Sequence, residues 1–154
     1  VKYDQGGHIL WTRTINGTDP NRDAFCFGLS LDAQDNIILG GTLPFLGQGF
    51  NFVTAKYDGN GNQIWNRTYN GAANGDDLIY KMAVDANNNA YVVNSELSTS
   101  VQGTNSDRIM RVTSDGVVST FAGNLLLVGW GAALVFGRIP DAGRGTSRAV
   151  VTVE

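Results

Sequence analysis

The sequence is poor in the residues that build covalent cross-links and metal centres. Cys26 is the only cysteine and His8 the only histidine among 154 residues. A lone cysteine excludes an internal disulfide and a multi-cysteine zinc site, and a lone histidine excludes metal sites that need two imidazoles. It also leaves few routes to a histidine-based catalytic triad. These absences point away from catalysis, and we expect no catalytic residues and no bound organic cofactor.

Charged residues are also scarce. They make up 16% of the chain, with 14 acidic and 11 basic residues, for a net charge of −3. A nucleic-acid partner requires a clustered excess of lysine and arginine to neutralise phosphates, and the sequence has no such cluster, so we expect no nucleic-acid partner. Hydrophobic residues reach 42%, which is enough to bury a core and argues against disorder. The 20 glycines and many asparagines supply turns rather than helix surface.

An internal repeat with a period near 54 residues organises the chain. Residues 1–17 return as residues 55–71, so that Lys2, Tyr3 and Trp11 correspond to Lys56, Tyr57 and Trp65. A third, more divergent copy of this first half occupies residues 108–124. The second half of the unit, at 27–42, returns at 81–95 and in a divergent form at 136–154.

Each half of the unit predicts a β-hairpin. Residues 52–58 and 63–69 alternate between two faces with a period of two, and clusters of Gly, Asn and Asp separate such runs. No window has a helical stripe of apolar residues. One unit thus contains four strands, expected at 78–85, 89–96, 108–113 and 117–123.

Four strands per repeat of this length are typical of a β-propeller blade. We therefore expect an all-β fold of consecutive four-stranded antiparallel propeller blades in an incomplete ring. The expected units are strands three and four of one blade at 1–17, whole blades at 24–71 and 78–124, and strands one and two of another at 132–154. Because three blades' worth cannot close a ring, we expect open edges and self-association, or a need for the remaining blades of a parent protein.

The repeat resembles the bacterial SBBP repeat, a β-propeller family. The matching segments are Ala83-Val84-Asp85 and residues 89–93, 51–58 and 65–71, and the likeness extends over residues 1–116. The resemblance implies secreted or cell-surface propellers within larger proteins, with no shared catalytic residues. The chain begins at Val1 without a signal-like segment, so we expect a piece of such a protein.

Two segments space oxygen-bearing side chains as calcium loops do. They offer the candidate ligands Asp58, Asn60 and Asn62, and Asp85, Asn87 and Asn89. Neither has the glycine that should come next or a bidentate glutamate at the end of the loop. A hairpin turn is therefore favoured over an ion site, because Asn and Gly suit turns that need positive φ angles.

Other repeated side chains have structural and functional interpretations. Trp11 and Trp65 are expected to pack one blade on the next rather than to stack on a ligand. The recurring pairs of Lys2 with Arg13 and Lys56 with Arg67 are expected on a solvated strand face, near aspartates, rather than in an anion site. The adjacent carboxylates of residues 76–77 are expected in a loop, pointing apart into water.

Residues 117–137 contain no charged residue but too many polar residues and glycines for a membrane span. Where the other blades have a polar connection, this one has apolar residues, so Leu126, Leu127 and Trp130 are candidates for an interaction surface.

Three functions are consistent with these patterns. The favoured one is a non-catalytic scaffold that binds a protein or glycan through the loops at 16–23, 42–49, 95–106 and 125–130. A calcium-stabilised adhesin module and part of a propeller enzyme, either a quinoprotein or a glycan-cleaving enzyme, are the alternatives.

Overall fold

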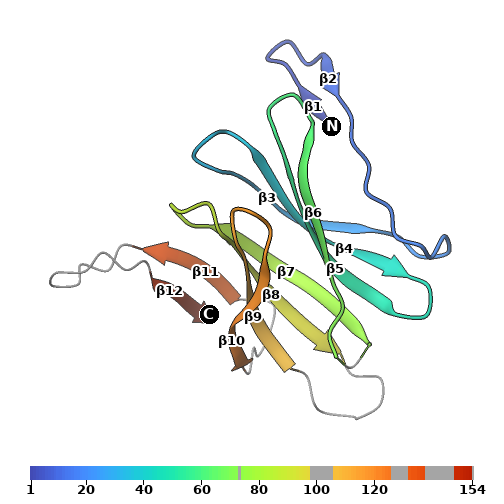
Figure 1. Ribbon diagram of the computed structural model, residues 1–154, viewed down its shortest axis with the longest axis vertical. Helices are drawn as coiled ribbons and strands as arrows, with labels where there is room; N and C mark the ends of the chain where they lie inside the picture. The colour runs from blue at the N-terminus through green and yellow to red at the C-terminus, as the bar shows by residue number, and fades with distance from the viewer. Residues whose placement is uncertain (73, 98–105, 126–131, 138–147, 154) are drawn as a thin grey trace, which may run out of the picture.

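The computed structural model describes residues 1–72, 74–97, 106–125, 132–137 and 148–153 (Figure 1). All regular structure within these ranges is β-strand. The chain begins with a hairpin of β1 (Lys2–Tyr3) and β2 (Ile9–Trp11). The first four-stranded sheet contains β3 (Phe25–Leu31), β4 (Ile37–Phe45), β5 (Gly49–Tyr57) and β6 (Gln63–Tyr69). The second contains β7 (Asp76–Val84), β8 (Ala90–Leu97), β9 (Ser106–Val112) and β10 (Val118–Leu125), and a final hairpin contains β11 (Ala132–Gly137) and β12 (Arg148–Val153).

The expected all-β class is confirmed, as are the four-stranded antiparallel sheets. In each sheet the strands are hydrogen-bonded in chain order, and every pairing is antiparallel. The sheets described here do not close a ring. No helix in the described part of the chain is long and apolar enough to cross a membrane.

The hairpin turns share one hydrogen-bonded design. Asp32, Asp58 and Asp85 each accept, on one carboxylate oxygen, the backbone N–H groups two and four residues further on. Thr113 replaces the aspartate in the turn before β10 and accepts the N–H of Val117 through its hydroxyl. The residue three positions after each of these has a φ between +60° and +88°, namely Asp35, Gly61, Asn88 and Gly116. This left-handed position explains why the turns are rich in Gly, Asn and Asp.

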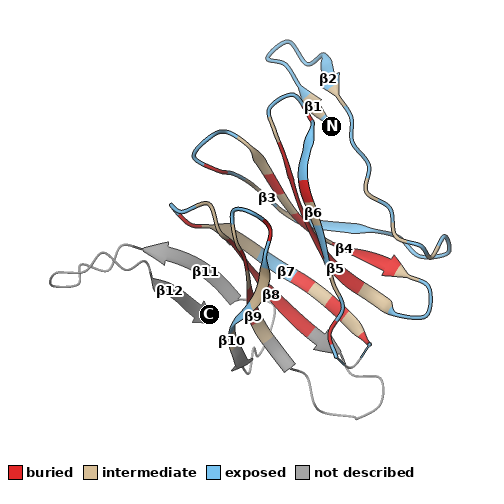
Figure 2. Cartoon of the chain, viewed as in Figure 1, coloured by how far each residue is buried: buried red, intermediate tan, exposed pale blue. Residues whose placement is uncertain are grey.

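The second sheet packs on one face of the first. Strand β7 contacts β3, β4 and β5, and Figure 2 shows that buried segments concentrate where the two sheets meet. Phe52 of the first sheet packs in one cluster with Ile79, Val92 and Met110 of the second. Glycine permits the close approach of the strands, since a Cβ on Gly28 would lie 2.9 Å from the Cβ of Met82.

Tryptophan and arginine side chains on the fourth strand of the first sheet reach the second sheet. The Trp65 indole Nε1 donates to the Ser114 carbonyl over 3.0 Å, and the Arg67 Nε donates to the Gly116 carbonyl over 2.7 Å. We call this pair of contacts the Trp–Arg clamp. Trp65 is buried in a core cluster with residues of both sheets, which confirms that it packs one sheet on the next.

The N-terminal hairpin repeats the same clamp on the first sheet. The Trp11 Nε1 donates to the Gly59 carbonyl over 3.1 Å, and the Arg13 Nε donates to the Gly61 carbonyl over 2.6 Å. The hydrogen bonds that join consecutive sheets are therefore part of the repeat.

Replacing Trp65 with alanine tests the clamp. We expect Trp65→Ala to lower the free energy of unfolding by about 3–5 kcal/mol, because it empties a buried site and leaves the Ser114 carbonyl without its donor. Trp11→Ala removes the equivalent, half-buried side chain and should cost less. Urea unfolding of both variants measures the difference, and equal losses would contradict a clamp that works through burial between two complete sheets.

Candidate functional site

A buried ion pair joins the first turn of the first sheet to its third strand. The Lys56 Nζ lies 2.7 Å from the Asp32 Oδ2, and the two side chains are 7% and 0% exposed. The sequence predicted Lys56 on a solvated strand face near an aspartate. Lys56 does pair with an aspartate, but the prediction of a solvated face is wrong because its side chain is buried. Burial raises the pKa of Asp32, but hydrogen bonds from Lys56, Asn36 and backbone N–H groups outweigh it and lower the pKa to about 2. The pair is surrounded by protein, so it fixes the turn rather than offering a site for an anion.

Acid should remove the stability that Asp32 contributes. Its pKa is about 2 in the folded chain against a usual value of 3.8, so its contribution of about 2 kcal/mol is complete above pH 4 and is lost as the pH falls towards 2. We expect Lys56→Met to be destabilised at pH 7 and to lose less further stability than the wild type between pH 4 and pH 2.

The control for this pH experiment is Lys2→Met, which removes the equivalent but partly exposed lysine of β1. It should change the free energy of unfolding by less than about 0.5 kcal/mol. Urea unfolding at several pH values measures all three proteins. Parallel pH profiles for the wild type and Lys56→Met would contradict the assignment of the ion pair.

The candidate calcium ligands lie in two hairpin turns whose aspartates already have donors. The Asp58 Oδ2 accepts the Asn62 amide over 2.8 Å, and the Asp85 Oδ2 accepts the Asn89 amide over 3.0 Å. The hydrogen bonds from Asn62 lower the pKa of Asp58. Each asparagine turns its amide donor, not its carbonyl, towards the carboxylate. The side chains of Asn60 and Asn87 are exposed. These contacts support the hairpin-turn interpretation.

Calcium should leave the melting temperature of the chain unchanged. A site with a Kd one hundredth of the added calcium concentration would stabilise the fold by about 2.7 kcal/mol. We expect the same Tm in 10 mM calcium (roughly a hundredfold over a 0.1 mM site) and in excess chelator, measured by calorimetry. A calcium-dependent rise that Asp58→Asn abolishes would instead establish the ion site.

The adjacent carboxylates at 76–77 do not lie in a loop. They begin β7 and point to different surroundings, and Asp77 is fully buried rather than in water, which corrects the expectation. Asp77 accepts the Gly71 N–H over 2.6 Å and the Asn94 side-chain amide over 3.0 Å. Asp76 accepts the Phe50 N–H over 2.8 Å. Both carboxylates are thus used to connect strands, which disfavours a shared proton or a catalytic pair.

Three connections meet at one end of the first sheet. The segment at 16–23 joins the turn between β4 and β5, because the Thr18 N–H donates to the Pro44 carbonyl and the Leu46 N–H donates to the Thr18 hydroxyl. The connection between β6 and β7 also contacts the turn between β4 and β5, because the Asn74 side-chain amide donates to the Gly47 carbonyl over 3.2 Å. The expected loop at 42–49 is shorter than predicted, since β4 extends to Phe45 and β5 starts at Gly49.

Aromatic and basic side chains are exposed on this cluster of connections. The Arg22 guanidinium lies 3.8 Å from the centre of the Phe50 ring, and the Phe25 ring packs against Phe50 with centroids 6.0 Å apart. Phe25 is 48% exposed and Leu46 70% exposed. Arg22 also lies 3.9 Å from the Asp76 carboxylate. We call these side chains, Arg22, Phe25, Leu46 and Phe50, the loop-end surface. The sequence analysis expected binding at these loops but did not identify these residues.

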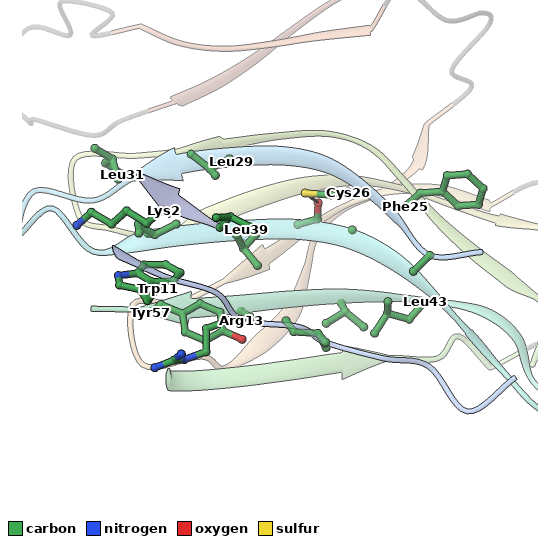
Figure 3. Close-up of a pocket in the computed structure, with 18 of the residues that line it drawn as sticks. Lys2, Trp11, Arg13, Phe25, Cys26, Leu29, Leu31, Leu39, Leu43 and Tyr57 are labelled. Carbon is green, nitrogen blue, oxygen red and sulfur yellow. Dashed lines mark hydrogen bonds between the residues drawn. The ribbon is translucent and has the colours of Figure 1, made fainter. Parts of the chain in front are cut away.

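A pocket of about 700 Å³ opens between the N-terminal hairpin and the first sheet (Figure 3). Its floor consists of side chains on the face of the first sheet opposite to the second sheet, among them Leu29, Leu31 and Leu39. Trp11 and Tyr57 lie at one side of it with ring centroids 6.4 Å apart, and Cys26 faces into it. The apolar alternation of β3 and β4 was a signal for this face in the sequence.

The remaining candidates add no site to these surfaces. Leu126, Leu127 and Trp130 lie outside the described residues. His8 is exposed, and its Nδ1 lies 3.1 Å from the Asp4 carboxylate across its own turn. Among the residues that the structure describes, no three His, Cys, Asp or Glu side chains are grouped to hold a metal ion.

A scan against protein-family models and a search of curated proteins both gave no match to the chain.

Proposed function

We propose that this chain is part of a β-propeller scaffold that binds a protein partner through the loop-end surface. The observation that carries the proposal is the repeated stacking of one sheet on the next. Strand β7 contacts β3, and β11 contacts β7, so the first strands of successive units are neighbours. The Trp–Arg clamp recurs between the N-terminal hairpin and the first sheet and between the first and second sheets. This order is the one that a propeller requires around its axis.

The stacking supports a scaffold role. At the loop end, buried contacts between the sheets and the N–H groups that Asp76 and Asp77 accept from Phe50 and Gly71 fix the strand ends, and the connections there can then present side chains with little loss of entropy on binding. The resemblance to SBBP repeats supports a secreted or cell-surface parent protein, as proposed from the sequence. The structural use of both carboxylates at 76–77 weakens the case for a glycan-cleaving enzyme.

The composition of the loop-end surface favours a protein partner. Arg22 and Phe25 both contact Phe50, and the exposed Leu46 lies in the turn that precedes β5. Arginine and aromatic side chains dominate the energetics of protein interfaces. The Arg22 charge is partly balanced by Asp76 and lies over an aromatic ring, so both are held in place before a partner arrives. Exposed rings also suit a sugar face, which makes a glycan the second candidate.

Selection from a random peptide library on the immobilised chain tests this proposal. We expect selected peptides to lose at least tenfold in affinity for Arg22→Ala and Leu46→Glu, because both changes alter the exposed anchors. Lys81→Ala, which removes an exposed basic residue of β7 away from this surface, is the control and should bind as the wild type does.

The readout is fluorescence polarisation with labelled peptides, and a glycan array screened with the same variants tests the second candidate. Peptides or glycans that bind all variants equally would show that the loop-end surface is not the site.

A further inference from the structure

The chain contains four Asn-Gly steps, which begin at Asn16, Asn60, Asn70 and Asn74. An asparagine before glycine is chemically labile, because no side chain on the glycine hinders its backbone nitrogen from attacking the asparagine side-chain amide. The attack requires that the glycine N–H can lose its proton and that the asparagine side chain can turn towards it. The contacts of each step therefore decide whether it reacts in the folded chain.

The steps at Asn60 and Asn74 are constrained by their own surroundings. The Gly61 N–H donates to the Asp58 carbonyl over 3.0 Å inside a hairpin turn, and Gly61 is buried. The Asn74 side-chain amide donates to the Gly47 carbonyl over 3.2 Å, which turns it away from its own backbone. Neither step is free to close a ring.

The steps at Asn16 and Asn70 occupy the same position of the repeat, since residues 13–17 correspond to residues 67–71. Gly71 is buried, and its N–H donates to the Asp77 Oδ2 over 2.6 Å. This hydrogen bond to a carboxylate must break before the Gly71 nitrogen can attack, and the negative charge disfavours loss of the amide proton. Asp77 therefore protects Asn70.

The first sheet has no counterpart of this carboxylate. Asp77 lies eight residues before the turn aspartate Asp85, and the residue eight positions before the equivalent Asp32 is Ala24. Strands β3 and β7 also have their register shift at the same distance from these turns, so the two positions are equivalent in the structure as well. An alanine side chain offers no acceptor to the connection that precedes it.

The Asn16-Gly17 step is accordingly unconstrained. Among the residues that the structure describes, no acceptor is bonded to the Gly17 N–H and no partner to the Asn16 side chain, which is exposed. The acceptor that Gly17 lacks would come from the sheet that follows the connection. The difference between Gly17 and Gly71 is therefore independent of what precedes β1.

We propose that Asn16 deamidates spontaneously in the folded chain, whereas Asp77 protects Asn70. The Gly17 nitrogen forms a bond to the Asn16 Cγ, the bond from Cγ to Nδ2 breaks, and ammonia leaves with the Gly17 amide proton. Water then opens the five-membered imide at either of its carbonyl groups, which gives aspartate or isoaspartate. In isoaspartate the main chain passes through the former side chain and is one methylene longer.

The added methylene lies beside an anchor of the loop-end surface. A Cβ on Gly17 would collide with the Pro44 carbonyl, so the main chain has no spare room there. The Thr18 N–H donates to the same carbonyl over 2.9 Å, and the Thr18 hydroxyl accepts the Leu46 N–H over 3.0 Å. Lengthening the chain at residue 16 displaces Thr18 and releases Leu46.

Peptide mapping by mass spectrometry tests the modification on the folded 154-residue chain during incubation at mildly alkaline pH. We expect deamidation of Asn16, in tryptic peptide 14–22, at least about tenfold faster than that of Asn70, in peptide 68–81, because only the second requires a hydrogen bond to a carboxylate to break. In concentrated urea, which removes these contacts, the two steps should react at similar rates. Asn16→Gln, which cannot form the five-membered imide, should leave peptide 14–22 unmodified.

Amide hydrogen exchange tests the structural consequence. The Leu46 N–H should exchange at least about tenfold faster in the isoaspartate form than in the unmodified chain, because it loses the Thr18 hydroxyl as its acceptor. Asn16→Asp is the matched control. It adds the same charge without the methylene, and its Leu46 N–H should exchange as in the wild type.

Equal rates at Asn16 and Asn70 in the folded chain would overturn the inference. A difference that persists unchanged in urea would also overturn it, because the contacts of the folded chain would then play no part. Unchanged exchange of Leu46 in the isoaspartate form would refute the displacement of Thr18. Neither measurement uses a binding partner, so the result is independent of the proposed function.

Discussion

Contact between the face of one sheet and the first strand of the next is the constraint on which this structure depends. A single four-stranded sheet of this size has two faces and cannot bury both alone. In this chain β7 packs across β3, β4 and β5, and Trp65 and Arg67 of β6 donate hydrogen bonds to the turn between β9 and β10. The tryptophan and arginine contacts recur between the N-terminal hairpin and the first sheet, and the face of the first sheet that β7 does not cover exposes leucines.

This constraint also positions the two surfaces of interest, which meet at Phe25, a residue that lines the pocket and packs against Phe50. The loop-end surface lies at the ends of the strands, where stacking does not consume side chains, so Arg22, Phe50 and Leu46 are available to a partner from outside. The pocket lies on a sheet face, where Leu29 and Leu31 are exposed. One surface lies at the ends of the strands and the other on a sheet face, and the properties of each follow from its position relative to the stacking direction.

Much of the fold was predictable because its causes are local. Period-two alternation and turn residues gave the strands, and the expected strand at 89–96 differs from β8 by one residue at each end. The hairpin turns were predictable since a side-chain oxygen and a residue with positive φ are close in sequence. Burial was not predictable. Lys56 and Asp77 look like surface residues by type, and only the approach of Asp32 from a turn and of Asn94 from another strand makes their burial tolerable.

The sequence by itself determined an all-β chain of hairpins with a repeated four-stranded unit, because hydrogen bonding within hairpins and alternation of side chains act over a few residues. It also placed tryptophan at equivalent positions. The tertiary structure alone decided which faces are covered, which charges are paired, and that the connections at 16–23, 46–48 and 70–75 meet at one end. The physical reason is that burial depends on contacts between residues far apart in the chain, and these exist only once the sheets are stacked.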